Sequence, residues 1–171
     1  MNSTNDKPPT EINKRARFSL SKIGRNLVTV LVLSSIGLLG ISMTSKQPDN
    51  LGVTAGKLAA CPDTPNCVST QADDPAKKMK PVAFRGSPSE AISKIKEVVK
   101  LNYPRAKLIS ETEYYLHYEF KSLIFRFIDD VEFFVDDNSS VIQFRSASRV
   151  GHSDLGVNRK RMNQLAESLK P

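Results

Sequence analysis

Residues 114–145 read YYLHYEFKSLIFRFIDDVEFFVDDNSSVIQFR, and apolar side chains recur there at about every second position. A repeat of two is typical of β-strands, whose successive side chains point to opposite faces of a sheet. The stretch is also rich in aromatic and β-branched residues, which favour strands. We therefore predict strands at 114–120, 123–128, 131–135 and 141–145, a hairpin turn at 136–140, and a preceding strand at 107–110.

Two helices are expected to flank these strands. Residues 87–90 read Ser-Pro-Ser-Glu, a capping box with proline at the first helical position, and apolar residues with helical spacing follow them. This helix should end before Pro104, which disfavours helical geometry at the residue before it. Asp154 is expected to cap a second helix that runs to about Leu169. Residues 81–84 are predicted to form a short strand ahead of the first helix.

The predicted order is strand, helix, four or five antiparallel strands in a meander, and a C-terminal helix. Both helices would then cover one face of a curved sheet, which defines an α+β layer. The order resembles the TATA-binding-protein-like and helix-grip arrangements. This resemblance is one of topology and implies no function.

An uncharged apolar segment, residues 27–43, precedes the domain. At about 1.5 Å per residue it would extend for roughly 25 Å, the short end of the range for transmembrane helices. Basic residues are more frequent before it than after it, which predicts a cytoplasmic N-terminus. We therefore predict a basic leader at 1–26, one transmembrane helix or signal anchor at 27–43, a tether at 44–60 and a periplasmic α+β domain at 61–171.

Three alternatives to this inner-membrane anchor remain open. Cleavage of the segment as a signal peptide would release a secreted domain, although Gly40-Ile41-Ser42 is a weak match to a cleavage site. Residues 58–61, Leu-Ala-Ala-Cys, resemble a bacterial lipobox, but residues 44–57 separate them from the apolar segment. A buried helix of a soluble protein is disfavoured because the segment has no polar face.

Composition narrows the class of protein. A chain of 171 residues is long enough for one domain with accessory segments and too short for a multidomain enzyme. Of the 25 basic and 18 acidic residues, 8 and 3 lie in residues 1–60, so 25 − 8 = 17 and 18 − 3 = 15 remain for the domain. A balance of +2 is weak for nucleic-acid binding, and we predict no nucleic-acid partner.

The two cysteines, Cys61 and Cys67, enclose five residues that include two prolines. Prolines favour turns, so the thiols can meet, and in an oxidising compartment we predict a disulfide. Two unpaired thiols and a metal site are the alternatives. A metal site would need further ligands, and neither His117 nor His152 has zinc-finger spacing, so no metal or other cofactor is predicted.

Charged and polar side chains gather at 126–132 and around the strand-to-helix junction at 145–161. Arginines, serines and the free N–H groups of a helix start would suit an anionic ligand such as a phosphate or a lipid headgroup. In the alternative, the acids neutralise the arginines in an internal ion-pair network. Both interpretations concern the same residues: Arg126, Asp129, Asp130, Glu132, Arg145, Ser146, Ser148, Arg149, Ser153, Asp154, Asn158, Arg159 and Arg161.

Catalysis is the least favoured interpretation. Residues 151–156, Gly-His-Ser-Asp-Leu-Gly, resemble the nucleophile turn of hydrolases, but the spacing is one residue too long and no histidine follows. Asp129 and Asp130 are neighbours, so on a strand they would point in opposite directions and make a poor acid and base pair. We predict no catalytic residues.

The motifs around the cysteines and the junction carry a family resemblance. Cys61-Pro62, residues 65–69 (Pro-Asn-Cys-Val-Ser), Arg126-Phe127, residues 129–132 and residues 145–161 together resemble domain of unknown function 1499. The resemblance covers nearly all of residues 61–169. The chain departs from the family pattern at Thr70, where a second serine often stands, and in its long tether.

The family resemblance implies a small protein, mainly bacterial or plastid, that often has an N-terminal hydrophobic segment and has no established activity. With the apolar leader and the cysteine pair, it leads to the hypothesis of a membrane-anchored, non-catalytic envelope domain that acts as a binding or assembly module. Its expected partners are the membrane, through residues 27–43, and an anionic small molecule, a lipid headgroup or an envelope protein.

Overall fold

The computed structural model describes residues 26–33, 45–123 and 126–171, in two compact units, Met1–Gly40 and Ile41–Pro171. In the first unit, residues 26–33 are helical, and apolar side chains such as Leu27 and Leu33 are exposed. The predicted segment 27–43 continues into residues 34–43, which lie outside the described residues. Within the described residues, no helix has the length and apolar character needed to cross a bilayer.

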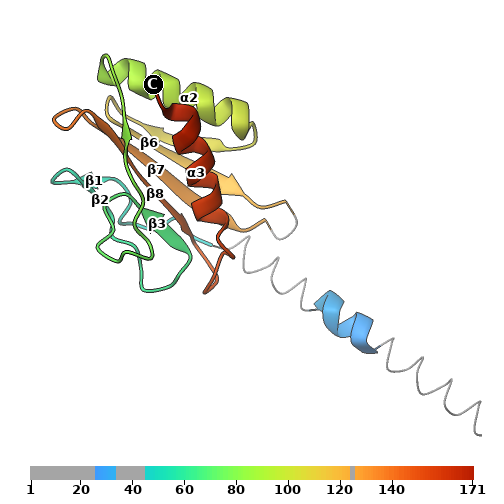
Figure 1. The fold of residues 1–171 in the computed structure, drawn as a ribbon. Coiled ribbons are helices and arrows are strands. Elements are labelled where there is room, and N and C mark those ends of the chain that lie inside the picture. The colour runs from blue at the N-terminus through green and yellow to red at the C-terminus, as the bar shows by residue number, and fades with distance from the viewer. Residues whose placement is uncertain (1–25, 34–44, 124–125) are drawn as a thin grey trace, which may run out of the picture. The chain divides into compact units, whose positions relative to one another are not determined.

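The second unit contains a six-stranded antiparallel sheet and two helices (Figure 1). Four consecutive strands form a meander, as predicted: β5 (Lys107–Glu111), β6 (Tyr115–Lys121), β7 (Ile128–Asp136) and β8 (Val141–Ser148). The other edge of β8 pairs with β3 (Cys67–Ser69) and β4 (Val82–Ala83). A separate hairpin consists of β1 (Val53–Thr54) and β2 (Lys57–Leu58). The predicted α+β class is confirmed.

The predicted strand at 123–128 is wrong at residues 123, 126 and 127, which are not in a strand, and residues 124–125 lie outside the described residues. β6 ends at Lys121 and β7 begins at Ile128, where Ser122 N donates to Phe127 O at 2.9 Å. β7 then runs through Asp129 and Asp130, where we expected a break between strands. Adjacent acids can lie inside this strand because both side chains are buried against arginines, as described below.

The N-terminal part of the domain also differs from expectation. The strand predicted at 81–84 contains only the two residues of β4, and three strands precede it among the described residues. The segment 44–60, expected to be a tether, contains the β1–β2 hairpin. Leu58 there is only 6% exposed, and its N–H donates to Gln71 Oε1 at 2.8 Å. The packed part of the chain therefore begins before Cys61.

Helix α2 (Pro88–Asn102) begins as predicted. Ser87 Oγ accepts a hydrogen bond from Glu90 N at 3.3 Å, and Glu90 Oε2 accepts one from Ser87 N at 2.7 Å, which completes the capping box. One face of the helix is buried, and it contains the predicted apolar residues Ala91, Ile92, Ile95, Val98 and Val99.

Helix α3 (Val157–Leu169) begins differently from the prediction. Its N-cap is Gly156, with φ of 79°, and not Asp154. Asp154 nevertheless binds the helix start, because its carboxylate accepts from Gly156 N at 3.0 Å and from Asn158 N at 2.7 Å. The aspartate therefore holds the first turn from outside the helix.

Both helices cover one face of the sheet (Figure 1), and the hydrophobic core lies between the helices and that face. Val131, Phe133 and Val135 of β7 belong to this core, so the alternate positions of β7 face the other way. That opposite face is buried as well, because the segment before β1 lies against it: Gly52 N donates to Glu132 Oε1 at 2.8 Å.

Candidate functional site

The predicted site residues divide between the two faces of the sheet. Asp129 and Asp130 are neighbours on β7, so their side chains point to opposite faces. Asp129 contacts Arg161 of α3, whereas Asp130 contacts Arg149, which follows β8. The expected single constellation is therefore two clusters.

The helix-side cluster ties α3 to the sheet. Arg161 Nη2 pairs with Asp129 Oδ2 at 2.6 Å, and Arg161 Nη1 donates to Asn158 Oδ1 at 2.7 Å. The guanidinium carbon also lies 4.7 Å from the ring centroid of Phe120, a cation–π contact. The cluster is completed by hydrogen-bonded hydroxyl groups of β8, and its members are Asp129, Ser146, Ser148, Asn158 and Arg161.

Asn66 links this cluster to the disulfide loop. Cys61 and Cys67 form the predicted disulfide. Asn66, next to Cys67, accepts at its backbone O from Asn158 Nδ2 at 3.0 Å and donates from Nδ2 to Gly151 O at 2.6 Å. Asn66 is not among the predicted site residues, although its position inside the cysteine loop is a signal for its role.

The far-side cluster lies on the opposite face of the sheet. Arg149 donates from Nε to Asp130 Oδ2 at 2.8 Å and from Nη2 to Glu119 Oε1 at 2.6 Å. His117 Nε2 lies 2.7 Å from Asp130 Oδ1, and the His117 side chain is only 1% exposed. These four residues place one guanidinium between two carboxylates in a buried site.

A second ion pair extends the far-side cluster. Arg145 Nη1 contacts Glu132 Oε2 at 3.1 Å, and Glu132 Oε1 also accepts from Tyr115 OH at 2.9 Å. Arg145 Nε is buried and has no hydrogen-bond partner among the described residues. Sequence reasoning missed the roles of Tyr115, His117 and Glu119 here, although strand alternation placed all three on one face of β6.

In the far-side cluster, electrostatic interactions keep both Asp130 and Arg149 ionised. Burial raises the pKa of Asp130, but the hydrogen bonds and charges of Arg149 and His117 outweigh it, so the pKa lies below its ordinary value. The hydrogen bond to Asp130 raises the pKa of Arg149, which therefore stays charged. Burial, followed by the charge of Glu132, raises the pKa of Tyr115, so its hydroxyl remains a donor.

Four predicted residues lie outside both clusters. One of them, Asp154, binds the backbone N–H groups at the start of α3. Arg126 is exposed, with φ of 54°. Ser153 is exposed, and its Oγ accepts from Leu155 N at 3.2 Å. Arg159 donates to the backbone oxygens of Ala76 and Lys78 and lines a groove of about 670 Å³ between the β4 segment and α3. These residues do not converge with the buried arginines.

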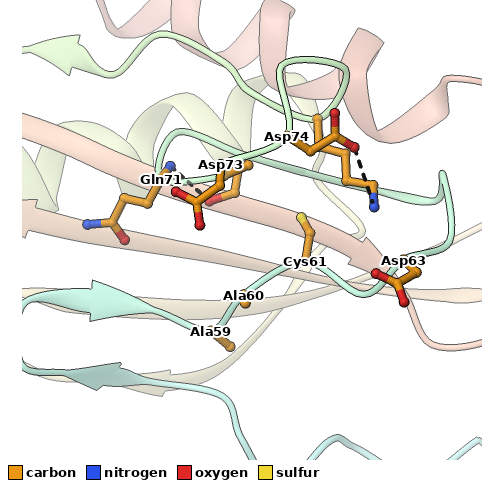
Figure 2. A pocket seen from close by; sticks show the side chains of 10 residues that line it. Ala59, Ala60, Cys61, Asp63, Gln71, Asp73 and Asp74 are labelled. Atoms are coloured by element: carbon orange, nitrogen blue, oxygen red, sulfur yellow. Dashed lines mark hydrogen bonds and ion pairs between the residues drawn. The ribbon is translucent and has the colours of Figure 1, made fainter.

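A smaller cavity of about 240 Å³ has Cys61, one of the two disulfide cysteines, in its lining (Figure 2). Asp63, Asp73 and Asp74 contribute to its lining, and Lys77 pairs with Asp74 at 3.7 Å. In the part of the chain that the structure describes, no group of three or more histidine, cysteine, aspartate or glutamate side chains is arranged to hold a metal ion. The cavity therefore offers a polar surface without a metal-binding set.

Comparison with known proteins yields one family. The model of the family described as "Protein of unknown function (DUF1499)" matches residues 57–169, which is well over half of the chain. No curated protein matches. The matched range includes both clusters and the disulfide.

Proposed function

The chain belongs to the DUF1499 family of proteins of unknown function, and we propose that it is a membrane-anchored, non-catalytic domain of the bacterial envelope that acts as a binding or assembly module. In this proposal residues 27–43 cross the inner membrane once and residues 61–171 lie in the periplasm. The basic residues before the apolar segment support this orientation.

The observation that carries the proposal is the Cys61–Cys67 disulfide. Disulfides form and persist mainly in oxidising compartments such as the periplasm and are rare in the cytosol. The disulfide follows the apolar segment in the sequence, so an exported domain would carry it on the oxidising side of the membrane. The apolar segment and the disulfide are independent observations, and both support a periplasmic location for the domain.

The burial of the ionisable groups supports a role without catalysis. His117 and Asp130 form the histidine–carboxylate pair of the far-side cluster, and both side chains are almost fully buried. A general base must come within hydrogen-bond distance of its substrate, which these groups can do only if the fold opens. Their contacts fit a structural role.

Topology is tested by fusing alkaline phosphatase after Pro171 and, as a matched control, after Arg25. Because the phosphatase is active only where its own disulfides form, we expect activity from the first fusion and none from the second. Membrane fractionation and alkylation without reductant should place the full chain in the membrane with both cysteines blocked. An expressed but inactive Pro171 fusion, with soluble protein and two free thiols, would refute the proposal.

Anion recognition is the second candidate function, and Arg159 favours it. Arg159 lines the 670 Å³ groove together with Lys78, Lys80 and Lys170. Glu167 also lines the groove and pairs with Lys170, so basic side chains remain in excess there. The arginines of the two clusters are less suited to this role, because carboxylates of the same domain occupy their guanidinium groups. In this candidate function the ligand would bind in the groove and not at the strand-to-helix junction.

A further inference from the structure

The chain enters the domain at one end of the sheet. We call this the entry end and define it by the end of β6 at Lys121, the start of β7 at Ile128 and the end of β8 at Ser148. These positions adjoin one another, because Lys121 pairs with Ile128 and Arg149 N donates to Ile128 O at 3.0 Å. Ser45 belongs to the same end, since Arg149 Nη1 donates to Ser45 O at 3.5 Å.

This inference rests on the membrane anchor of the proposed function. If the anchor ends at residue 43, only two residue steps separate it from Ser45. Two steps span at most about 7 Å even when the chain is fully extended. The contact of Ser45 with Arg149 would therefore hold the entry end at the membrane surface, without a long tether between them.

The entry end presents apolar side chains that the fold does not bury. Leu155 is 93% exposed in the segment between β8 and α3, and Val157, the first residue of α3, is 50% exposed. Leu123 is 70% exposed in the loop after β6. Single exposed leucines are common on protein surfaces. Here three apolar side chains lie on segments that follow β6 and β8, the two neighbours of β7, at the same end of the sheet. This is the pattern expected of a surface that enters the interfacial layer of a membrane.

The fold holds Leu155 in its exposed position. Leu155 has φ of 55°, which is uncommon for a residue other than glycine. Its N–H is bound by Ser153 Oγ, and Asp154 binds the N–H groups of the next turn. Asn66 Nδ2 also binds Gly151 O, which ties the segment to the disulfide loop. These hydrogen bonds fix the backbone on both sides of Leu155, so its side chain stays exposed to solvent.

Exposed cations accompany these side chains. Lys46 follows Ser45, and Lys121 and Arg126 flank the loop that carries Leu123. Lysine and arginine near a bilayer are attracted to anionic lipid headgroups. We propose that the entry end docks on the outer surface of the anchoring membrane, with Leu155, Leu123 and Val157 in the headgroup layer and the cations on anionic lipids.

Docking predicts opposite environments for the two ends of the sheet. Ser139 is exposed in the β7–β8 turn, at the other end from Leu155. At about 3.3 Å per residue, β7 separates these ends by roughly 26 Å, which would place Ser139 outside the headgroup layer when the entry end is docked. Leu155→Cys and Ser139→Cys each add one thiol for a fluorescent label, because the native cysteines are joined in the disulfide.

The test uses full-length protein in vesicles of phosphatidylethanolamine with a minority of phosphatidylglycerol. We expect a nitroxide-bearing lipid to quench the label at position 155 and aqueous iodide to leave it bright, with the reverse for the label at position 139. Equal iodide quenching at both positions, in protein that floats with the vesicles, would overturn docking and leave the anchor intact. Protein that does not float with the vesicles would overturn both.

Discussion

At the scale of single residues, the most informative feature is the pair of neighbouring aspartates on β7. Asp129 and Asp130 point to opposite faces, and each meets a different arginine. A buried ion pair adds little net stability compared with apolar residues of the same shape. Loss of one partner is costly, however, because the remaining charge is left buried. These residues therefore matter to stability even if they bind nothing.

Arg149→Ala tests this interpretation. The substitution leaves Asp130 and Glu119 buried without their cation, and we expect it to lower the free energy of unfolding by about 3 to 5 kcal/mol. Arg126→Ala is the matched control, because Arg126 is exposed, and it should change stability by less than about 0.5 kcal/mol. Urea denaturation measures both. Similar stabilities of the two variants would argue against the ion-pair network.

The same pair predicts a pH dependence. The folded-state pKa of Asp130 lies below the ordinary value of 3.8, so its stabilisation is complete above that pH and is lost as the pH falls through the folded-state pKa. The stability difference between the wild type and Arg149→Ala should therefore narrow below pH 3.8. A difference that stays constant in acid, measured by urea denaturation over a pH series, would contradict the assignment.

At the scale of elements, the two helices differ in what specifies them. Helix α2 carries its own start signal, the capping box of Ser87 and Glu90. Helix α3 begins at a glycine without a side-chain cap, and its start is held by Asp154, while Asn158 and Arg161 fix it to the sheet. Local sequence therefore defines α2, whereas α3 combines a local contact at its start with contacts from Asn158 and Arg161 to the sheet.

Ser87→Ala tests the local signal of α2. The substitution removes the acceptor for Glu90 N, and loss of such an N-cap costs about 1 kcal/mol. Ser93→Ala, in the exposed interior of the same helix, is the control and should leave stability equal or slightly higher, because alanine has the better helix propensity. Thermal unfolding followed by circular dichroism compares the two. A larger loss from Ser93→Ala would contradict a dominant role of the cap.

At the scale of the whole domain, the disulfide loop connects parts of the chain that are distant in sequence. Cys67 belongs to β3, which pairs with β8, and the neighbouring Asn66 contacts both Asn158 in α3 and Gly151 in the segment before it. The short covalent loop thus orders a residue that links the sheet to the helix. Loss of the disulfide should therefore also affect the segment around Gly151 and the start of α3.

Replacement of both cysteines, Cys61→Ser with Cys67→Ser, tests this connection. The cysteines are six positions apart, and closing a loop of that size contributes about 2 kcal/mol in the chain-entropy model. We expect a loss of that order, together with faster amide hydrogen exchange in residues 149–156. Reduction of the wild type should reproduce both effects. Unchanged exchange in that segment would show that Asn66 holds it without the disulfide.

Several features could be predicted because they depend on local sequence. The alternation of residues 114–120 and 141–145, the turn at 136–140 and the capping box of α2 each follow from neighbouring residues. The start of β7 was not predicted, because Asp129 and Asp130 look like a break between two strands when their partners are unknown. The apolar residues before them were therefore assigned to a separate strand at 123–128. Arg149 and Arg161, which neutralise those acids, lie at least 19 positions away in the sequence.

The sequence by itself determined the α+β class, the meander and the pairing of the two cysteines, since these follow from side-chain alternation and short-range turns. Only the tertiary structure decided how the charged residues combine. Pleating sends Asp129 and Asp130 to opposite faces, so residues that look like one motif in the sequence form two separate clusters. The partner of a buried charge is set by which strands and helices meet in space, because a charge within the protein must be neutralised where it lies.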